Sequence, residues 1–202
     1  MSKCMAKNDV KVTPRMLKYL AVPEGNKMIE IVSWVLQEAL GLIDVKRWSK
    51  CMPADKFYEF FHPYARESKS IVGLLRRAEN VYLLAVTLGG GLEQRSKEYF
   101  HNNEFFRGYI LDRLGSFLVE EEARKLDLDI CCECQRNGLT ATHRYSPGYR
   151  DFSIKAQQIF LDLVKNSIPG LKISSGYLLC PEKTVTAIKG VIKPEHHTMA
   201  IP

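Results

Sequence analysis

The amino-acid sequence predicts one α+β domain spanning residues 1–202. Segments with helical spacing and short apolar segments typical of strands follow one another without a regular alternation, which argues against a doubly wound parallel fold. No internal repeat or low-complexity linker divides the chain. With 202 residues, of which 46% are hydrophobic and 26% charged, the chain can bury a proper core without a disulfide or a metal.

Composition excludes several classes of protein. The longest apolar runs, such as residues 81–87, are far shorter than the roughly 20 residues that cross a bilayer, and the polar N-terminus lacks the apolar region of a signal peptide. Twenty-nine Lys and Arg against 23 Asp and Glu give a net charge of +6, without a block of five like charges or a nucleic-acid-binding motif. We therefore expect a cytoplasmic protein with reduced thiols that binds neither membranes nor nucleic acid.

Two helices open the sequence. Thr13 followed by Pro14 is typical of a helix start, because the hydroxyl can cap free amides and proline loses no hydrogen bond at the first helical position. A short helix follows. Apolar residues recur at helical spacing from 29 to 40, so we predict a second, amphipathic helix with Asn26 as its cap and Gly41 as its stop.

A buried strand is expected at the centre of the sheet. Residues 81–87 are apolar throughout and rich in strand-forming residues, which is typical of a strand covered on both faces. Short apolar and aromatic runs over 42–62, broken by prolines, indicate further strands. The remaining expected elements are helices over 68–78, 92–100, 103–126 and 153–164, a loop over 131–149, and strands over 171–173, 177–180 and 185–192.

Three glycines, Gly89, Gly90 and Gly91, follow the buried strand and precede a helix. Such a loop can cradle a phosphate or a nucleotide, because glycine lets the backbone approach and a helix N-terminus offers free amides. Neither the dinucleotide fingerprint nor the Lys-Ser/Thr pair of a phosphate loop is present. The pattern favours a tight turn, and a ligand-contacting loop is the alternative.

A cysteine cluster is the second candidate. Cys131, Cys132 and Cys134, with His143 and Cys180 further on, carry the thiolate and imidazole donors that zinc or iron prefers. Structural zinc sites usually take two separated cysteine pairs, and that spacing is missing. Free thiols without a metal are the favoured interpretation, and a small metal-binding redox protein is a weaker alternative.

The densest group of interaction-prone residues is the segment 143–151. A turn at Pro147-Gly148 is flanked by two tyrosines and two arginines. Arg144 can hold a carboxylate through two parallel hydrogen bonds, while Tyr145 or Tyr149 can offer a ring face to a cation or a base. The composition indicates a recognition loop, with a braced surface turn as the alternative.

Residues Arg144–Tyr149 match the Arg-x-x-x-Gly-Tyr signature of the activation, or reactivation, domain of cobalamin-dependent methionine synthase. Three further segments resemble that domain in the same order: Val86–Glu93, Asp112–Ser116 and Leu178–Ala187. Together they cover the chain from 80 to 192, and residues 1–79 are expected to complete the fold. The sequence resembles the short, free-standing members of this family.

The resemblance implies an α+β domain with a twisted, mainly antiparallel sheet flanked by helices, which binds S-adenosylmethionine in a shallow groove. It implies a reactivation subunit for reductive methylation of cob(II)alamin on a separate methionine synthase or related corrinoid methyltransferase. That partner supplies the cobalamin, a flavodoxin-like donor supplies an electron, and the chain is a component of the methyltransferase activity in methionine biosynthesis. A module that senses S-adenosylmethionine without methyl transfer is the alternative.

The resemblance also implies roles for single residues. Arg144 would bind the carboxylate of S-adenosylmethionine, the backbone at Ser146 would contact the ligand, and Tyr149 would close the groove. Tyr145 and Gly148 belong to the same binding loop. No residue is assigned a catalytic role or a metal, because a sulfonium methyl is already activated and needs only to be oriented.

The sequence departs from the family on a helix and near the N-terminus. The position of a ligand-binding glutamate is occupied by Ser116, and Glu120 lies one turn further along the same helix. Either Glu120 binds the amino group of the ligand or that contact is lost. The N-terminal aspartate of the family has no clear match near residues 19–22.

Overall fold

The protein is described here from a computed structural model, which places residues 11–23 and 25–194. These residues form two compact units. The first unit contains the described residues up to Lys46, together with Val86–Glu122 and Cys180–Thr184. The second unit contains Arg47–Ala85, Ala123–Leu179 and the described residues from Val185 onward.

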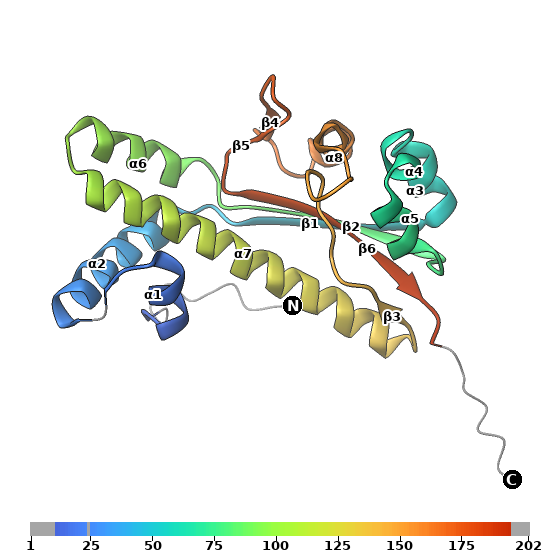
Figure 1. The fold of residues 1–202 in the computed structure, drawn as a ribbon, viewed down its shortest axis with the longest axis horizontal. Helices are drawn as coiled ribbons and strands as arrows, with labels where there is room; N and C mark the ends of the chain where they lie inside the picture. The colour runs from blue at the N-terminus through green and yellow to red at the C-terminus, as the bar shows by residue number, and fades with distance from the viewer. Residues whose placement is uncertain (1–10, 24, 195–202) are drawn as a thin grey trace, which may run out of the picture. The chain divides into compact units, whose positions relative to one another are not determined.

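Helices and strands are mixed along the chain (Figure 1), which confirms the predicted α+β class. None of the helices in the described ranges is both long enough and apolar enough to cross a bilayer. In chain order the elements are α1 (Pro14–Leu20), α2 (Asn26–Leu42), β1 (Lys46–Pro53), α3 (Ala54–Phe60), α4 (Tyr64–Glu67), α5 (Lys69–Leu75), β2 (Asn80–Thr87), α6 (Gly91–His101), α7 (Phe105–Arg136), β3 (Thr140–Ala141), the 3-10 turn η1 (Ile154–Ala156), α8 (Gln157–Val164), β4 (Lys172–Ile173), β5 (Leu179–Cys180) and β6 (Thr184–Ile192).

Four strands form an antiparallel sheet in the order β1-β2-β6-β3, and β4 pairs with β5 separately. The predicted central position of the buried strand is confirmed, because β2 lies between β1 and β6. At the edge, Thr140 of β3 pairs with Ile192 of β6.

Alternate residues of β2 face opposite layers of the second unit. Leu83 packs into an aromatic cluster that includes Phe57 of α3 and Phe160 of α8. Leu84 points the other way and packs with Ile130 and other residues from the C-terminal part of α7. Both faces of the strand are therefore covered, as its continuous apolar sequence predicted.

In the first unit, α2 and α6 are joined by a partly buried polar contact and by one close backbone approach. Glu38 of α2 accepts hydrogen bonds of 2.7 Å from both the Arg95 guanidinium and the Tyr99 hydroxyl of α6. At the start of α6, a Cβ on Gly91 would lie 2.5 Å from the Leu42 carbonyl oxygen. Only glycine permits this contact, which explains Gly91, and the φ of +74° at Gly89 favours glycine there as well.

Three predicted elements need correction. Residues 42–62 form β1 but continue into α3, because Phe57 and Phe61 are buried at helical spacing. The N-cap of α2 is Gly25, which makes no side-chain capping bond, so Asn26 is the first helical residue instead of the cap. Gly41 lies inside the helix and does not end it. The expected loop from 131 starts too early, because α7 runs on to Arg136.

Candidate functional site

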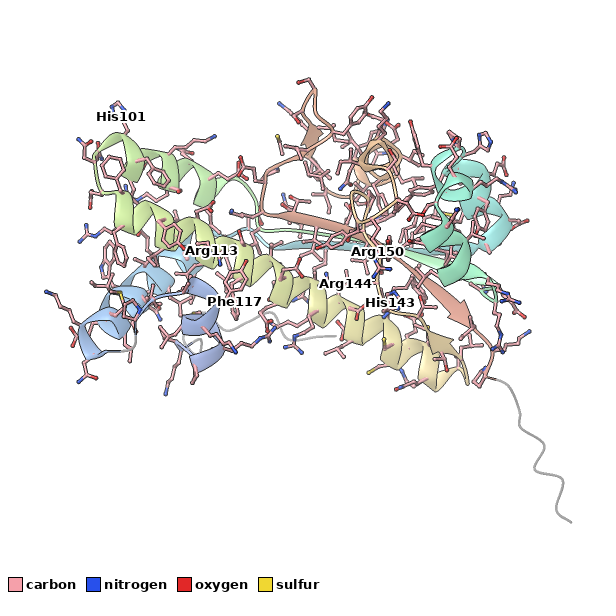
Figure 2. The ribbon with its side chains drawn as sticks, viewed as in Figure 1. His101, Arg113, Phe117, His143, Arg144 and Arg150 are labelled. Atoms are coloured by element: carbon pink, nitrogen blue, oxygen red, sulfur yellow. The ribbon has the colours of Figure 1, made fainter. Side chains whose placement is uncertain are left out.

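The predicted recognition loop joins β3 to η1 in the second unit, and Figure 2 shows His143, Arg144 and Arg150 along it. Its first anchor is Tyr145, whose backbone exchanges two hydrogen bonds of 2.9 Å with Ile188 on β6. Because β6 is an inner strand of the sheet, this end of the loop is fixed to the rigid part of the unit.

A tight turn at Gly148 shapes the middle of the loop. Gly148 has a φ of +89°, and its amide donates to the Phe152 carbonyl at 2.8 Å. A Cβ at this position would lie 2.9 Å from Cδ1 of Ile154, so a side chain is excluded by both backbone conformation and packing. The glycine at position 148 is therefore required for a local steric reason.

Asp151 provides the second anchor. Its carboxylate accepts hydrogen bonds from the Ser68 hydroxyl at 2.9 Å and from the Ser70 amide at 3.1 Å. Hydrogen bonds from Ser70, together with that from Ser68, lower the pKa of Asp151 to about 2. The ionised carboxylate thus ties the end of the loop to the start of α5.

Between these anchors, the loop presents aromatic and cationic groups. The Tyr149 side chain is 65% exposed. Its ring centroid lies 6.4 Å from that of Tyr145, whose ring also packs against the buried Phe152. Arg144, which directly precedes Tyr145 in the sequence, is half-buried. A guanidinium and exposed ring faces on a braced backbone suit a ligand with a carboxylate and a planar group.

Ser116 and Glu120 lie on α7 in the first unit, so they belong to a different unit from the loop. The Ser116 hydroxyl is engaged within its own unit: it donates to the Asp112 carbonyl at 3.3 Å and accepts from the Lys183 ammonium at 3.0 Å. Lys183 also pairs with the Asp112 carboxylate at 2.6 Å. Ser116 is therefore part of an internal polar network.

The same network joins three of the resembling segments. The Glu93 carboxylate accepts hydrogen bonds from the backbone amides of Glu182 and Lys183. Through Lys183, the segment after β5 is also joined to Asp112 on α7. In this unit, these segments hold one another in place.

Glu120 borders a hollow of about 390 Å³ between α1 and α7. The Arg113 guanidinium lies 4.5 Å from the Tyr19 ring and donates to the Tyr19 carbonyl at 2.6 Å. The Tyr19 ring in turn lies 5.4 Å from the ring of Phe117, one turn along α7 from Arg113 (Figure 2). The hollow is lined by Arg15, Lys18, Tyr19, Phe117, Glu120 and Glu121.

The sequence did not predict this hollow. Arg113, Phe117 and Glu120 are spaced by four and three residues, so they share one face of α7, and this spacing was the available signal. The part played by Tyr19 depends on tertiary contact between α1 and α7 and leaves no local pattern. Nε of Arg113 is buried without a hydrogen-bond partner among the described residues, which leaves one donor next to Tyr19 unused.

The cysteine cluster lies on a helix instead of the expected loop. Cys134 is buried in the layer between α7 and the sheet, while Cys132 is exposed. Cys131 accepts a hydrogen bond of 3.0 Å from the buried Lys189 ammonium. Within the described ranges, no three His, Cys, Asp or Glu side chains are grouped so that they could hold a metal ion.

Comparisons with known proteins add one finding to this geometry. No family model matches the sequence, and no curated protein matches it. A crystal structure of the MetH reactivation domain bound to AdoHcy superimposes with a TM-score of 0.56 over 87% of this chain, at 13% sequence identity. The chain has the fold of the MetH reactivation domain. It spans 64% of the length of that reactivation-domain structure.

The fold predicted from the four resembling segments is thus confirmed. The match covers most of the chain and extends well beyond the segments from which the resemblance was drawn. The roles of Arg144, Tyr145, Ser146, Gly148 and Tyr149 in ligand binding stay predictions, as does that of Glu120.

Proposed function

We propose that this chain binds S-adenosylmethionine and acts as a reactivation subunit that supports reductive methylation of cob(II)alamin on a separate cobalamin-dependent methionine synthase or related corrinoid methyltransferase. The observation that carries the proposal is the match to the fold of a MetH reactivation domain bound to AdoHcy, combined with a braced Arg-x-x-x-Gly-Tyr loop. The partner supplies the cobalamin, and a flavodoxin-like protein is the proposed electron donor.

The residues of the loop fit the ligand. The Arg144 guanidinium would bind its carboxylate, the backbone at Ser146 would contact it, and the exposed Tyr149 ring would cover it. A glycine turn and two anchors hold these groups in place before the ligand arrives, which reduces the entropy lost on binding.

Glu120 is the proposed acceptor for the amino group of the ligand. It is a carboxylate one turn after Ser116 on α7, and it borders the hollow lined by Tyr19 and Phe117. A carboxylate can accept from an ammonium far more strongly than a hydroxyl that already has a cationic donor.

When bound, S-adenosylmethionine supplies an already activated methyl group. The residues of this chain then have only to bind the ligand, orient it and exclude water, and no general acid or base is required of them. Such a task suits a site made of an arginine, the exposed Tyr149 ring and backbone groups.

Calorimetric titration with S-adenosylmethionine, alone and then in the presence of a cob(II)alamin-loaded corrinoid protein from the same cell, tests the proposal. Saturable binding that the corrinoid protein strengthens supports reactivation. Binding that the corrinoid protein leaves unchanged supports the sensing module instead. Absence of binding contradicts both functions.

A further inference from the structure

A cluster of exposed aromatic side chains lies on the first unit, on helices α2 and α7. Trp34, Phe105 and Phe106 are 49%, 58% and 44% exposed. With Glu30 and Ile31 they line a hollow of about 700 Å³. We call Trp34, Phe105 and Phe106 the aromatic face. Contiguous exposed apolar groups of this size mark interaction surfaces in soluble proteins.

The aromatic face is built on fixed elements. At the turn between α6 and α7, the Glu104 amide donates to the Tyr99 carbonyl at 2.8 Å, and Asn103 has a φ of +61°. The Arg107 guanidinium lies 4.7 Å from the Trp34 ring and pairs with the Glu104 carboxylate. Because the backbone of this turn and the Trp34 ring are held in this way, covering the face costs less conformational entropy than covering a flexible loop.

The charges around the aromatic face indicate what covers it. One face of α2 carries Glu30, Ile31 and Trp34, which follow Lys27 by three, four and seven residues. Glu30, Glu104 and Arg107 line the hollow, and Lys27 lies one turn before Glu30 on α2. The charges of these four side chains sum to zero, although the chain carries +6. This surface therefore has no net charge that a strongly acidic or basic partner could complement.

We propose that the aromatic face binds the same face of a second copy of this chain. In a twofold interface each surface meets itself, so a neutral face with both signs of charge is self-complementary. Lys27 of one copy would pair with Glu30 of the other around the buried aromatic rings. This interface uses residues of the first unit that are not assigned to ligand binding, so it does not depend on the proposed function.

Sedimentation velocity of the full chain, without any added ligand, tests the interface between roughly 1 µM and roughly 1 mM. We expect a two-chain species whose fraction rises with concentration. Trp34→Ala and Phe105→Ala should each raise the dimer dissociation constant by about tenfold or more. Phe60→Ala, which removes an aromatic ring of equal exposure (49%) from α3, is the matched control and should leave it unchanged.

Exchanging the charges of Lys27 and Glu30 is a control for variants that lose association only because they unfold. Lys27→Glu and Glu30→Lys should each weaken association, because like charges then face each other, whereas the double variant should restore it in both copies. A one-chain species over the whole concentration range overturns the proposal. So does a dimer that survives both aromatic substitutions, or single charge variants that the double exchange fails to rescue.

Discussion

The Lys183 ammonium donates a 3.0 Å hydrogen bond to the Ser116 hydroxyl. The Lys183 side chain is only 7% exposed and also pairs with Asp112, so the hydroxyl stabilises a nearly buried charge. Ser116 therefore has a structural role in this chain, and the binding of the ligand's amino group by Glu120 stays a prediction.

Exchanging these two side chains separately distinguishes their roles. Glu120→Gln should weaken S-adenosylmethionine binding by about 1 to 2 kcal/mol, because the amino group loses an ionised acceptor. Ser116→Ala should leave the affinity within about twofold and reduce the free energy of unfolding by about 1 kcal/mol. Calorimetry and urea unfolding measure the two effects, and equal affinities for both variants and the parent protein would remove Glu120 from the site.

Arg144 is expected to contribute most to ligand affinity. Arg144→Ala should weaken S-adenosylmethionine binding by about 2 to 4 kcal/mol, the usual cost of removing one partner of a desolvated charge pair. Arg150→Ala on the same loop is the control, with an affinity expected within about twofold of the parent. Unchanged calorimetric binding by the Arg144 variant would show that the loop is not the site.

Gly148→Ala tests whether the shape of the loop matters. Both Gly148 and Gly170 have a φ of +89°, but a Cβ meets another atom only at Gly148. Each alanine should cost about 1 to 2 kcal/mol of stability through the strained backbone. Only Gly148→Ala should also weaken ligand binding.

Ile154→Val gives an internal check, because it deletes Cδ1, the atom that the new Cβ would meet. Added to Gly148→Ala, it should recover most of the affinity. If Gly170→Ala weakens binding as much as Gly148→Ala, the steric explanation is wrong.

The buried ion pair between Lys189 and Asp127 should be important for folding. The Lys189 side chain is 1% exposed, and its Nζ lies 2.7 Å from Oδ1 of Asp127. Asp127→Ala leaves this charge without its anionic partner and should reduce the free energy of unfolding by about 3 kcal/mol. Asp129→Ala, at an exposed position of the same helix, should change it by less than about 0.5 kcal/mol. Urea unfolding followed by circular dichroism measures both.

The pKa of Asp151 predicts how stability depends on acidity. Hydrogen bonds from Ser70 and Ser68 lower this pKa to about 2, so the folded protein holds fewer protons than the unfolded chain between about pH 4 and about pH 2. The stabilisation from Asp151 is therefore complete above this window and is lost as pH falls through it. Asp151→Asn should flatten the stability profile in that window only, and an unchanged slope would show that the anchor does not contribute.

Local signals in the sequence predicted the start of several helices. Thr13 accepts a hydrogen bond from the Met16 amide, and Ser68 accepts one from the Ile71 amide, as capping residues do. Ser153 caps the turn before α8 in the same way. These contacts join residues two or three positions apart, which is why the sequence alone reveals them.

Elements that depend on distant contacts were harder to predict. The aromatic residues of α3 resemble a strand, yet Phe57 and Phe61 stack at 4.6 Å within the core and stabilise a helix. The segment with the cysteines was predicted to be a loop, yet Ile130 and Cys134 are buried and continue the buried face of α7. The helix ends only before Gly138, whose φ is +67°.

The candidate site divides along the same line. The loop from Arg144 to Tyr149 was visible because its glycine turn and charged residues are adjacent in sequence. The engagement of Ser116 by Lys183, and the contact between Tyr19 and Arg113, join residues far apart in the chain. No local sequence pattern predicts these contacts.

The different exposure of neighbouring thiols on α7 gives the protein a built-in reporter of local opening. Cys132 is exposed, so an alkylating reagent should modify it at once. Cys134 is buried, and desolvation raises the pKa of its thiol, so it should react only when the layer between α7 and the sheet opens. The alkylation rate of Cys134, with Cys132 as internal standard, thus measures how readily this layer opens, without denaturant.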